Sequence, residues 1–364
     1  MLKLIFTGDF APLPDPENIP EDNFNSLTSL LRECDLHITN LECPLTMSDK
    51  AIEKTGPSIK GHPGGIELLK QANVGLACLA NNHIFDYGEQ GILDTINLCE
   101  RNGIDTIGIV NRDDGHTKHL IKTIDDKKIG LINCCEHEFS VREPSLMGAN
   151  GYDDIDAFYQ ITELRKQTDY LIVIYHGGNE YYPLPSPMIK KIFHYLADLG
   201  ADTVIGHHSH VFSGYEWYND TPLIYSLGNF FFPYPDEPEE WHKAIICELN
   251  ISEQVELNFH PIEQCRNDLH VRLSDEATSK VARQEITKLS EIISDDHQLA
   301  FQWESYSRQH QKGLLKLFLA PGLFERLLLK LGVLRLRNFK HRSRVVKNHI
   351  RCQSLFNLLK QNLK

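Results

Sequence analysis

Short apolar runs alternate with amphipathic stretches of helical length over the first two thirds of the chain. The apolar runs are rich in Val, Ile and Leu and predict buried strands, whereas the amphipathic stretches predict helices packed beside them. Strands are expected at 3–7, 36–39, 74–79, 106–110, 129–133, 170–175, 203–205 and 223–225. Helices are expected at 64–71, 88–101, 153–167 and 187–199. This alternation is typical of an α/β fold and not of a bundle or an all-β barrel.

The pattern changes after residue 232. A Pro-rich acidic stretch at 233–240 predicts a loop, and two apolar runs at 244–249 and 255–261 predict a hairpin. A polar segment of helical character follows at 274–296. The chain then ends in a basic, Leu-rich tail.

Polar and titratable residues follow six of the predicted strands, where each strand ends. Because ligands bind outside the carboxyl ends of strands in open α/β sheets, we expect these side chains to converge. They are Asp9, Asn40, Glu42, Asn81, Asn82, His83, His176, His207, His208, His210 and Asn229. Carboxylate, carboxamide and imidazole groups form a mixed oxygen and nitrogen set without thiolates, which suits Mn, Fe or Zn. The set predicts a metal centre, and a dinuclear hydrolase is its natural interpretation.

Taken singly, these residues have simpler explanations. Asp9 could cap the segment after its strand, and the stretch Asn81–His83 could be a turn followed by an N-cap. Glu180 and Asn229 could contact substrate or satisfy loop backbone. Three imidazoles within the four residues His207–His210 favour metal ligation, because solvated loops rarely need them.

Five stretches together carry a family resemblance. They are Asn40-Leu-Glu-Cys-Pro-Leu-Thr46, Ala80-Asn-Asn-His-Ile-Phe-Asp-Tyr-Gly88, His176-Gly-Gly-Asn-Glu-Tyr181, Gly206-His-His-Ser-His-Val211 and Tyr225-Ser-Leu-Gly-Asn-Phe230. In this order and spacing, the sequence resembles the bacterial capsule-synthesis (poly-γ-glutamate biosynthesis) family, a branch of the calcineurin-like metallophosphoesterases. The resemblance implies a metallophosphoesterase-like, four-layer α/β/β/α sandwich, here followed by a basic helical C-terminal extension.

The resemblance also implies roles for individual residues. Asp9 and His210 would bind one metal ion, Glu42 would bridge, and Asn82, His176 and His208 would bind the second. His83 would be the general acid, with Asp86 holding its ring. Substrate would contact Asn40, Asn81, Glu180, His207 and Asn229. One or two divalent Mn, Fe or Zn ions are expected as cofactors.

The chain departs from the wider superfamily at two of these positions. Asp9-Phe10-Ala11 stands where an Asp-x-His is common, and Glu42 replaces a shorter Asp. Another stretch, Cys134-Cys135-Glu136-His137, also follows a strand and resembles a metal cluster, but the family pattern gives it no role. We interpret Cys134 and Cys135 as core or rim residues.

The implied activity is that of a metal-dependent, phosphoesterase-like hydrolase linked to capsule, poly-γ-glutamate or exopolysaccharide formation. One alternative is a non-catalytic metal-containing subunit that binds or positions an anionic polymer. Another is an amide or isopeptide hydrolase that acts on polyglutamyl chains. The expected substrate is an anionic polymer or a phosphorylated precursor, and capsule-biosynthesis proteins are the expected partners.

Charge is distributed unevenly. The net charge of −13 argues against nucleic-acid binding, but the segment Lys312–Lys364 carries +12 and residues 1–311 therefore carry −25. The resemblance implies a metallophosphoesterase-like domain at 1–265, and the composition after it predicts a polar helical segment at 266–311 and a basic tail at 312–364. The tail contains Leu323, Leu327, Leu331 and Leu334 at helical spacing. It could pack on the acidic body, which we favour, or lie on an anionic membrane surface.

The cysteine content and the hydropathy of the chain help to predict the cellular compartment of the protein. Nine cysteines without a CxxC spacing favour a reducing compartment. No apolar run approaches the length of a membrane-spanning helix, and the first ten residues read as a strand and not as a signal peptide. A cytoplasmic protein is expected, with peripheral membrane contact through the tail as the alternative.

Overall fold

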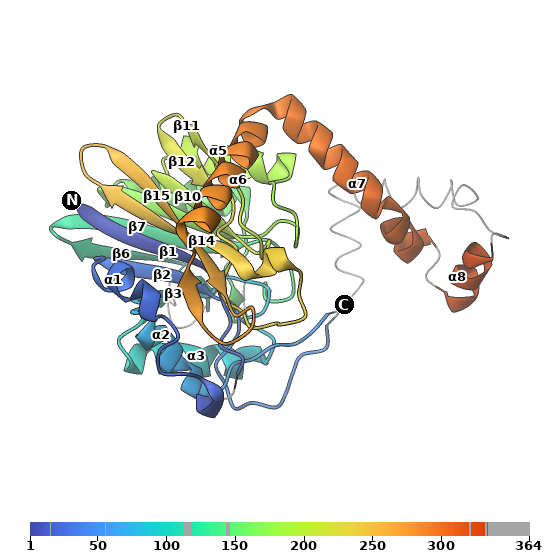
Figure 1. Ribbon diagram of the computed structural model, residues 1–364, viewed down its shortest axis with the longest axis horizontal. Helices are drawn as coiled ribbons and strands as arrows, with labels where there is room; N and C mark the ends of the chain where they lie inside the picture. Colours follow the sequence, from blue (N-terminus) through green and yellow to red (C-terminus); the bar gives the residue numbers. More distant parts are fainter. Residues whose placement is uncertain are drawn as a thin grey trace. The chain divides into compact units, whose positions relative to one another are not determined.

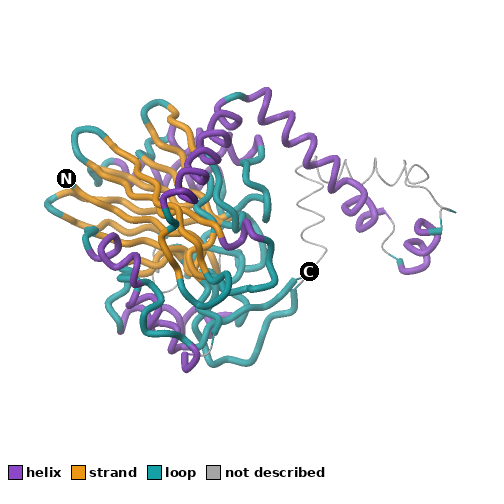
Figure 2. The backbone as a smooth tube through the Cα atoms, viewed as in Figure 1, coloured by secondary structure: helices purple, strands orange, loops and turns teal. Residues whose placement is uncertain are grey.

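The computed structural model describes residues 1–14, 16–54, 56–111, 118–142, 146–319, 322–331 and 333. Contacts divide the chain into two units, residues 1–299 and residues 300–364. The first unit contains two large β-sheets with helices beside them (Figure 1). Figure 2 shows the strands gathered in this unit, with loops at the ends of the sheets.

The first sheet has the order β16-β15-β14-β1-β2-β3-β4, with β13 paired to β1. Its centre is parallel, and β14 to β16 add an antiparallel flank. The strands are β1 (Leu2–Phe10), β2 (Leu36–Leu41), β3 (Leu76–Cys78), β4 (Asp105–Ile107), β13 (Asn229–Phe231), β14 (Lys243–Ile251), β15 (Val255–Gln264) and β16 (Val271–Leu273).

The second sheet has the order β11-β12-β10-β9-β7-β6. Its strands are β6 (His119–Ile124), β7 (Lys127–Cys135), β9 (Tyr170–His176), β10 (Thr203–His207), β11 (Tyr215–Tyr218) and β12 (Thr221–Ile224). A separate two-stranded sheet pairs β5 (Ile109–Val110) with β8 (Gly148–Ala149). The two large sheets meet where the backbone N–H of Ala80, after β3, donates to Asn133 Oδ1 of β7 at 2.7 Å.

Helices cover the outer faces of both sheets. Beside the first sheet lie α1 (Thr28–Arg32), α2 (Ile66–Gln71) and α3 (Gly88–Arg101), and beside the second lie α4 (Asp154–Arg165) and α5 (Pro187–Asp198) (Figure 1). Helix α6 (Glu276–Ser294) contacts β15 of the first sheet and β11 of the second. Four short 3₁₀ turns complete the unit, at Pro16–Asn18, Asn25–Leu27, Pro63–Gly65 and Glu239–His242. The expected four-layer α/β/β/α sandwich is confirmed.

Burial on both faces explains why the central strands have continuous apolar runs. All seven residues of β9 and all six of β2 are buried, as parallel strands covered by helices and a second sheet require. The register aligns the strand ends: Asp9 pairs with Asn40 and Asn229, and His176 pairs with Cys135 and His207. The polar residues that end these strands therefore lie at the same edge of each sheet.

Some element boundaries differ from the predicted ones. The predicted strand at 106–110 breaks at Gly108, which has a φ of +98° and lies where a Cβ would be 2.1 Å from Asn133 Oδ1. The sequence analysis did not identify β6, β11 and β13, which are short or mostly half-buried. The predicted hairpin is confirmed as β14 and β15. Cys134 and Cys135 are buried, which confirms their interpretation as core residues.

The C-terminal unit contains two described helices. Helix α7 (Asp296–Leu319) continues through the predicted boundary between residues 311 and 312, and α8 (Leu323–Lys330) follows. The expectations for Leu334 and for the rest of the basic tail fall outside the described residues. Among the described helices, none combines the length and the hydropathy needed to cross a bilayer.

Candidate metal centre

Strand ends bring the six predicted metal ligands into one buried cluster. Asp9 belongs to β1, Glu42 follows β2, and His176 ends β9. Asn82 follows β3, while His208 and His210 follow β10. Each of the six side chains belongs to a residue that is at most 6% exposed. The convergence predicted from the strand ends is therefore present.

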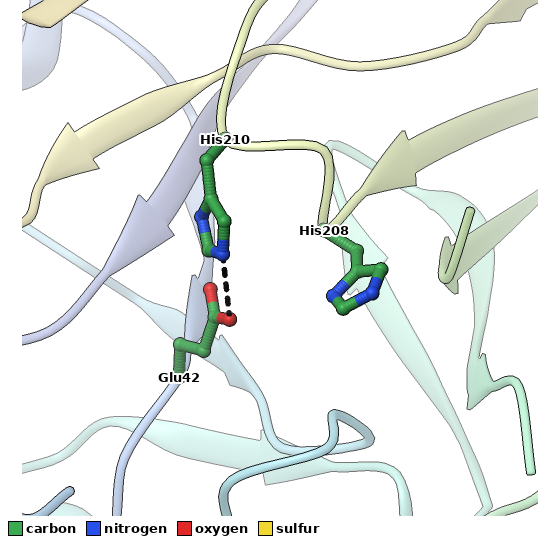
Figure 3. Close-up of side chains that lie close together, drawn as sticks. All are labelled: Glu42, His208 and His210. Carbon is green, nitrogen blue, oxygen red and sulfur yellow. Dashed lines mark ion pairs between the residues drawn. The ribbon is translucent and has the colours of Figure 1, made fainter. Parts of the chain in front are cut away.

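Glu42 lies at the centre of this cluster. One ligand-type atom from each of Glu42, His208 and His210 lies within 4.8 Å of the others, and the same holds for Asp9, Glu42 and His176. Figure 3 shows His210 and His208 directed toward Glu42 from one loop, with His210 Nε2 at 3.7 Å from Glu42 Oε1. Glu42 belongs to both groups, so its carboxylate lies where the two sets of ligand-type atoms meet. The assignment of each remaining ligand to a particular ion stays a prediction.

Asn40 contacts several members of the cluster. Its amide Nδ2 donates to Asp9 Oδ1 at 2.8 Å and lies 3.4 Å from Glu42 Oε2. The same nitrogen is 3.2 Å from His176 Nδ1. An amide nitrogen carries two hydrogens, so Asn40 can donate to two of these three acceptors at a time, and the contact with Asp9 is the shortest. Substrate binding by Asn40 stays a prediction.

Three polar atoms in the cluster lack hydrogen-bond partners among the described residues. Glu42 Oε1, His207 Nδ1 and His208 Nδ1 are buried from solvent and unsatisfied there. Buried polar atoms are almost always paired, so these three indicate a ligand that the protein is built to hold. Oxygen and imidazole nitrogen atoms around a shared carboxylate fit a divalent transition-metal ion.

The electrostatics of His176 and His208 agree with this fit. Burial, together with the charge of neighbouring imidazoles, lowers the pKa of His176 well below its ordinary value and that of His208 to about 3. Both rings are therefore neutral near pH 7, which is the state that binds metal. Burial and the adjacent Asp9 raise the pKa of Glu42. Burial alone would raise the pKa of Asp9 as well, but the adjacent imidazoles of His207 and His210 hold it well below the usual range.

The loop that carries the histidines is strained. His208 and His210 have φ values of 96° and 58°, in the left-handed region that non-glycine residues rarely occupy. Asn229 Oδ1 lies 3.0 Å from His210 Nδ1, and the Asn229 amide donates to the backbone oxygens of His210 and Trp241. The ring of Trp241 packs 4.6 Å from that of His210. Backbone strain fixed by surrounding contacts is typical of functional loops.

A second cluster surrounds His83. Its Nδ1 lies 2.7 Å from Asp86 Oδ2, which confirms that these residues are in contact as expected. The Lys54 ammonium pairs with Asp86 Oδ1 and lies 3.2 Å from His83 Nδ1, and its side chain is only 2% exposed. The backbone N–H of Ile59 also donates to Asp86 Oδ2 at 2.8 Å. The sequence analysis missed Lys54, because a lysine in a loop carries no local signal of burial.

The remaining predicted residues lie in distinct places. Asn81 Oδ1 accepts from the backbone N–H groups of His83 and Ile84, and its amide donates to the Leu41 oxygen, so it shapes the turn after β3. His207 Nδ1 lies 3.3 Å from Asp9 Oδ1. Glu180 is exposed, yet its charge contributes to the raised pKa values of Glu42 and His210. Substrate contact by these residues stays a prediction.

Two further carboxylates lie near the centre and have no predicted role. Burial raises the pKa of Glu136 to about 7, and burial also raises the pKa of Glu138. Glu136 Oε1 lies 3.4 Å from His208 Nε2. The sequence signal for Glu136 was its position directly after a strand, the same signal that identified the ligands.

The chain is similar in sequence to known proteins. The family profile described as bacterial capsule synthesis protein PGA_cap matches residues 3–234. The chain is 28% identical over 250 residues to a PGA biosynthesis protein CapA of Bacillus subtilis, and 26% identical over 223 residues to a capsule biosynthesis protein CapA of Bacillus anthracis. These alignments cover 64% and 57% of this chain, and 63% and 53% of the relatives' own lengths.

The fold is also similar to that of solved structures. A structure described as a novel phosphatase of Mycoplasma pneumoniae is 19% identical, with a TM-score of 0.47. That comparison covers 79% of this chain and 98% of the phosphatase.

Proposed function

Since the chain belongs to the bacterial capsule synthesis family PGA_cap, we propose that it is a metal-dependent hydrolase of the phosphoesterase type. The hydrolase would take part in the formation of a capsule, poly-γ-glutamate or another exopolymer. The observation that carries the proposal is the buried Glu42 carboxylate, which is common to two groups of ligand-type atoms and has an unpaired oxygen among the described residues.

The cluster around Glu42 would hold one or two Mn, Fe or Zn ions. Asp9, Asn82, His176, His208 and His210 supply the other donor atoms. When bound, such ions stabilise negative charge on a phosphoryl oxygen and lower the pKa of water. Asn40 keeps the carboxylate of Asp9 in place through its hydrogen bond, and Asn229 does the same for the His210 ring.

His83 would act on the leaving group. Asp86 contacts Nδ1 at 2.7 Å, closer than the Lys54 ammonium at 3.2 Å, and a carboxylate at that nitrogen favours the tautomer with the proton on Nδ1. Protonation of the ring then places the second proton on Nε2, from which it can pass to a leaving oxygen. Lys54 neutralises Asp86 from its other oxygen and so holds the pair together.

The substrate would be an anionic polymer or a phosphorylated precursor inside the cell, with other capsule-biosynthesis proteins as partners. The names of the Bacillus relatives, which refer to capsule and PGA biosynthesis, support this setting.

Three chromogenic substrates test the reaction class. Protein loaded with Mn²⁺ is assayed with p-nitrophenyl phosphate, bis-p-nitrophenyl phosphate and γ-glutamyl-p-nitroanilide. We expect hydrolysis of a phosphate ester that stops on chelation and is lost in His208→Ala. Cleavage of the anilide alone would favour an amide hydrolase instead. Metal-loaded protein that cleaves none of them would favour the non-catalytic alternative.

A further inference from the structure

Glu136 is the one member of the Cys134–His137 stretch that reaches the metal centre. Cys134 and Cys135 are buried in the core, and His137 Nε2 lies 2.9 Å from the backbone oxygen of Tyr152. Glu136 follows β7 and is directed toward His208. Neither the family pattern nor the proposed function gives it a role.

The backbone around Glu136 fixes its carboxylate. Its N–H donates to the oxygen of His176 at 2.9 Å, so the residue continues the pairing of β7 with β9 beyond Cys135. The N–H of Gly178 donates to Glu136 Oε1 at 3.2 Å. This backbone donor ties the carboxylate to the end of two paired strands, while 36% of the Glu136 side chain stays exposed.

Two glycines make room for this arrangement. A Cβ on Gly177 would lie 3.0 Å from Glu136 Cβ and 3.1 Å from its Cδ, closer than side chains normally approach. Gly178 has a φ of +129°, a conformation that favours glycine, and this conformation points its N–H at the carboxylate. The stretch His176-Gly-Gly therefore supplies a metal-ligand candidate and the space for Glu136 together.

The two nitrogens of His208 have different surroundings. Nε2 lies 3.4 Å from Glu136 Oε1, whereas Nδ1 is buried and has no hydrogen-bond partner among the described residues. In its ionised form the Glu136 carboxylate can only accept, so that form favours the tautomer that carries the proton on Nε2. The lone pair of the ring is then on Nδ1. A histidine that binds metal through one nitrogen commonly donates from the other to a carboxylate.

We propose that Glu136 is a positioning residue that accepts a hydrogen bond from His208 Nε2 and thereby presents Nδ1 as the metal-binding nitrogen. The inference rests on the proposed metal centre and adds to it the orientation of one ligand. The 3.4 Å separation is longer than an ordinary N–H···O bond. A cation on Nδ1 withdraws electrons from the ring and makes Nε2–H a stronger donor, which would tighten the contact.

NMR spectroscopy determines the tautomer of His208 directly. Protein labelled with ¹⁵N-histidine gives long-range ¹H–¹⁵N spectra that distinguish the two ring nitrogens, and His208→Gln identifies the His208 signals. In metal-free protein we expect the proton on Nε2, and addition of Zn²⁺ should shift Nδ1. A proton on Nδ1, or a Zn²⁺-induced shift at Nε2, would overturn the proposal. The metal-free measurement decides the question even if the chain binds no metal, so it separates this proposal from the proposed function.

Metal affinity gives a second, independent readout. Glu136→Gln keeps the size of the side chain but removes its charge, and we expect the apparent Kd for Mn²⁺ or Zn²⁺ to rise about 10- to 100-fold. Glu180→Gln is the matched control, because it removes the same charge near the centre without contact to His208; its Kd should rise much less. Equal weakening by the two substitutions would show that Glu136 acts only through general charge. X-ray absorption measures the coordination number of the bound metal. If Glu136→Gln lowers this number by one, Glu136 is a direct ligand and the proposal is wrong.

Discussion

The carboxylate of Glu42 is a buried group that its described neighbours leave only partly compensated. It is fully buried, it lies near the charge of Asp9, and its Oε1 has no hydrogen-bond partner within the described ranges. An isolated buried charge costs several kcal/mol unless a partner compensates it. Two neutral imidazoles and a second carboxylate around Glu42 can hold the cation that would supply this compensation.

A substitution of His83 tests whether this residue transfers a proton without binding metal. Because its described contacts are with Asp86 and Lys54, His83→Ala should retain most of the metal of the wild-type protein. The rate should fall at least about 100-fold, the size expected for loss of general acid catalysis. Elemental analysis and the phosphoester assay measure the two effects. A loss of metal equal to that of His208→Ala would show that His83 is itself a ligand.

Lys54 is expected to stabilise the fold as well as the site. Its ammonium is buried against Asp86, so Lys54→Met leaves a buried carboxylate without its cation. Removal of one partner of a buried ion pair typically costs about 3–5 kcal/mol of unfolding free energy. Urea denaturation should show a loss of about that size. Lys50→Met, an exposed change in the same loop, is the control, and equal stability of the two variants would refute the role of Lys54.

At the scale of elements, close backbone contacts hold the site together. Strand β1 pairs with β2 on one side, and the N–H of Asp9 donates to the Gly228 oxygen just before β13 on the other. This places Asp9 beside both Asn40 and Asn229, which come from distant parts of the sequence. The approach requires glycine at position 8, since a Cβ there would lie 1.9 Å from the Gly228 oxygen.

Gly8→Ala should therefore separate β1 from the Gly228 turn. A clash with backbone cannot be relieved by rotating a side chain, so we expect a loss of at least about 3 kcal/mol, at or above the usual range for overpacking. Gly130→Ala in β7 is the matched control, because its new Cβ would meet only ends of side chains, and it should cost less. Chemical denaturation compares the variants. Equal stability of Gly8→Ala and wild type would contradict the contact.

The elements show what could be predicted from sequence and what could not. Central strands such as β9 were predictable because burial on both faces leaves a continuous apolar run, and the polar residues after them marked the site. The break at Gly108 depends on Asn133, which lies far away in sequence. Lys54 and the Glu136–His208 contact likewise depend on loops that meet only in the folded chain. A local sequence pattern does not indicate which distant loops will come into contact.

At the scale of the whole molecule, the uneven charge poses a question about the tail. Residues 1–311 carry −25 and the segment Lys312–Lys364 carries +12. The described side chains of Phe324, Leu327 and Leu331 are all more than half exposed. Apolar side chains exposed in this way, next to basic ones, suit either an acidic protein surface or an anionic membrane.

Truncation after Gln311 distinguishes these two roles. If the tail packs on the acidic body, as we expect, the truncated chain should melt at a lower temperature or aggregate. Differential scanning calorimetry measures this, and sedimentation with anionic liposomes at low and high salt measures membrane binding. An unchanged melting temperature together with salt-sensitive liposome binding that the truncation abolishes would support the membrane role and contradict the packing.

Metal content tests the central claim most directly, because every step of the proposed chemistry depends on the cluster around Glu42. Wild-type protein, expressed in medium supplemented with Mn, Fe and Zn and then dialysed, is analysed for its elements beside the double variant His176→Ala/His208→Ala. The account predicts about one to two transition-metal ions per chain in wild type, from the two ligand groups that share Glu42, and most of that metal lost in the variant. Wild-type protein without transition metal, or a double variant with unchanged metal content, would contradict it.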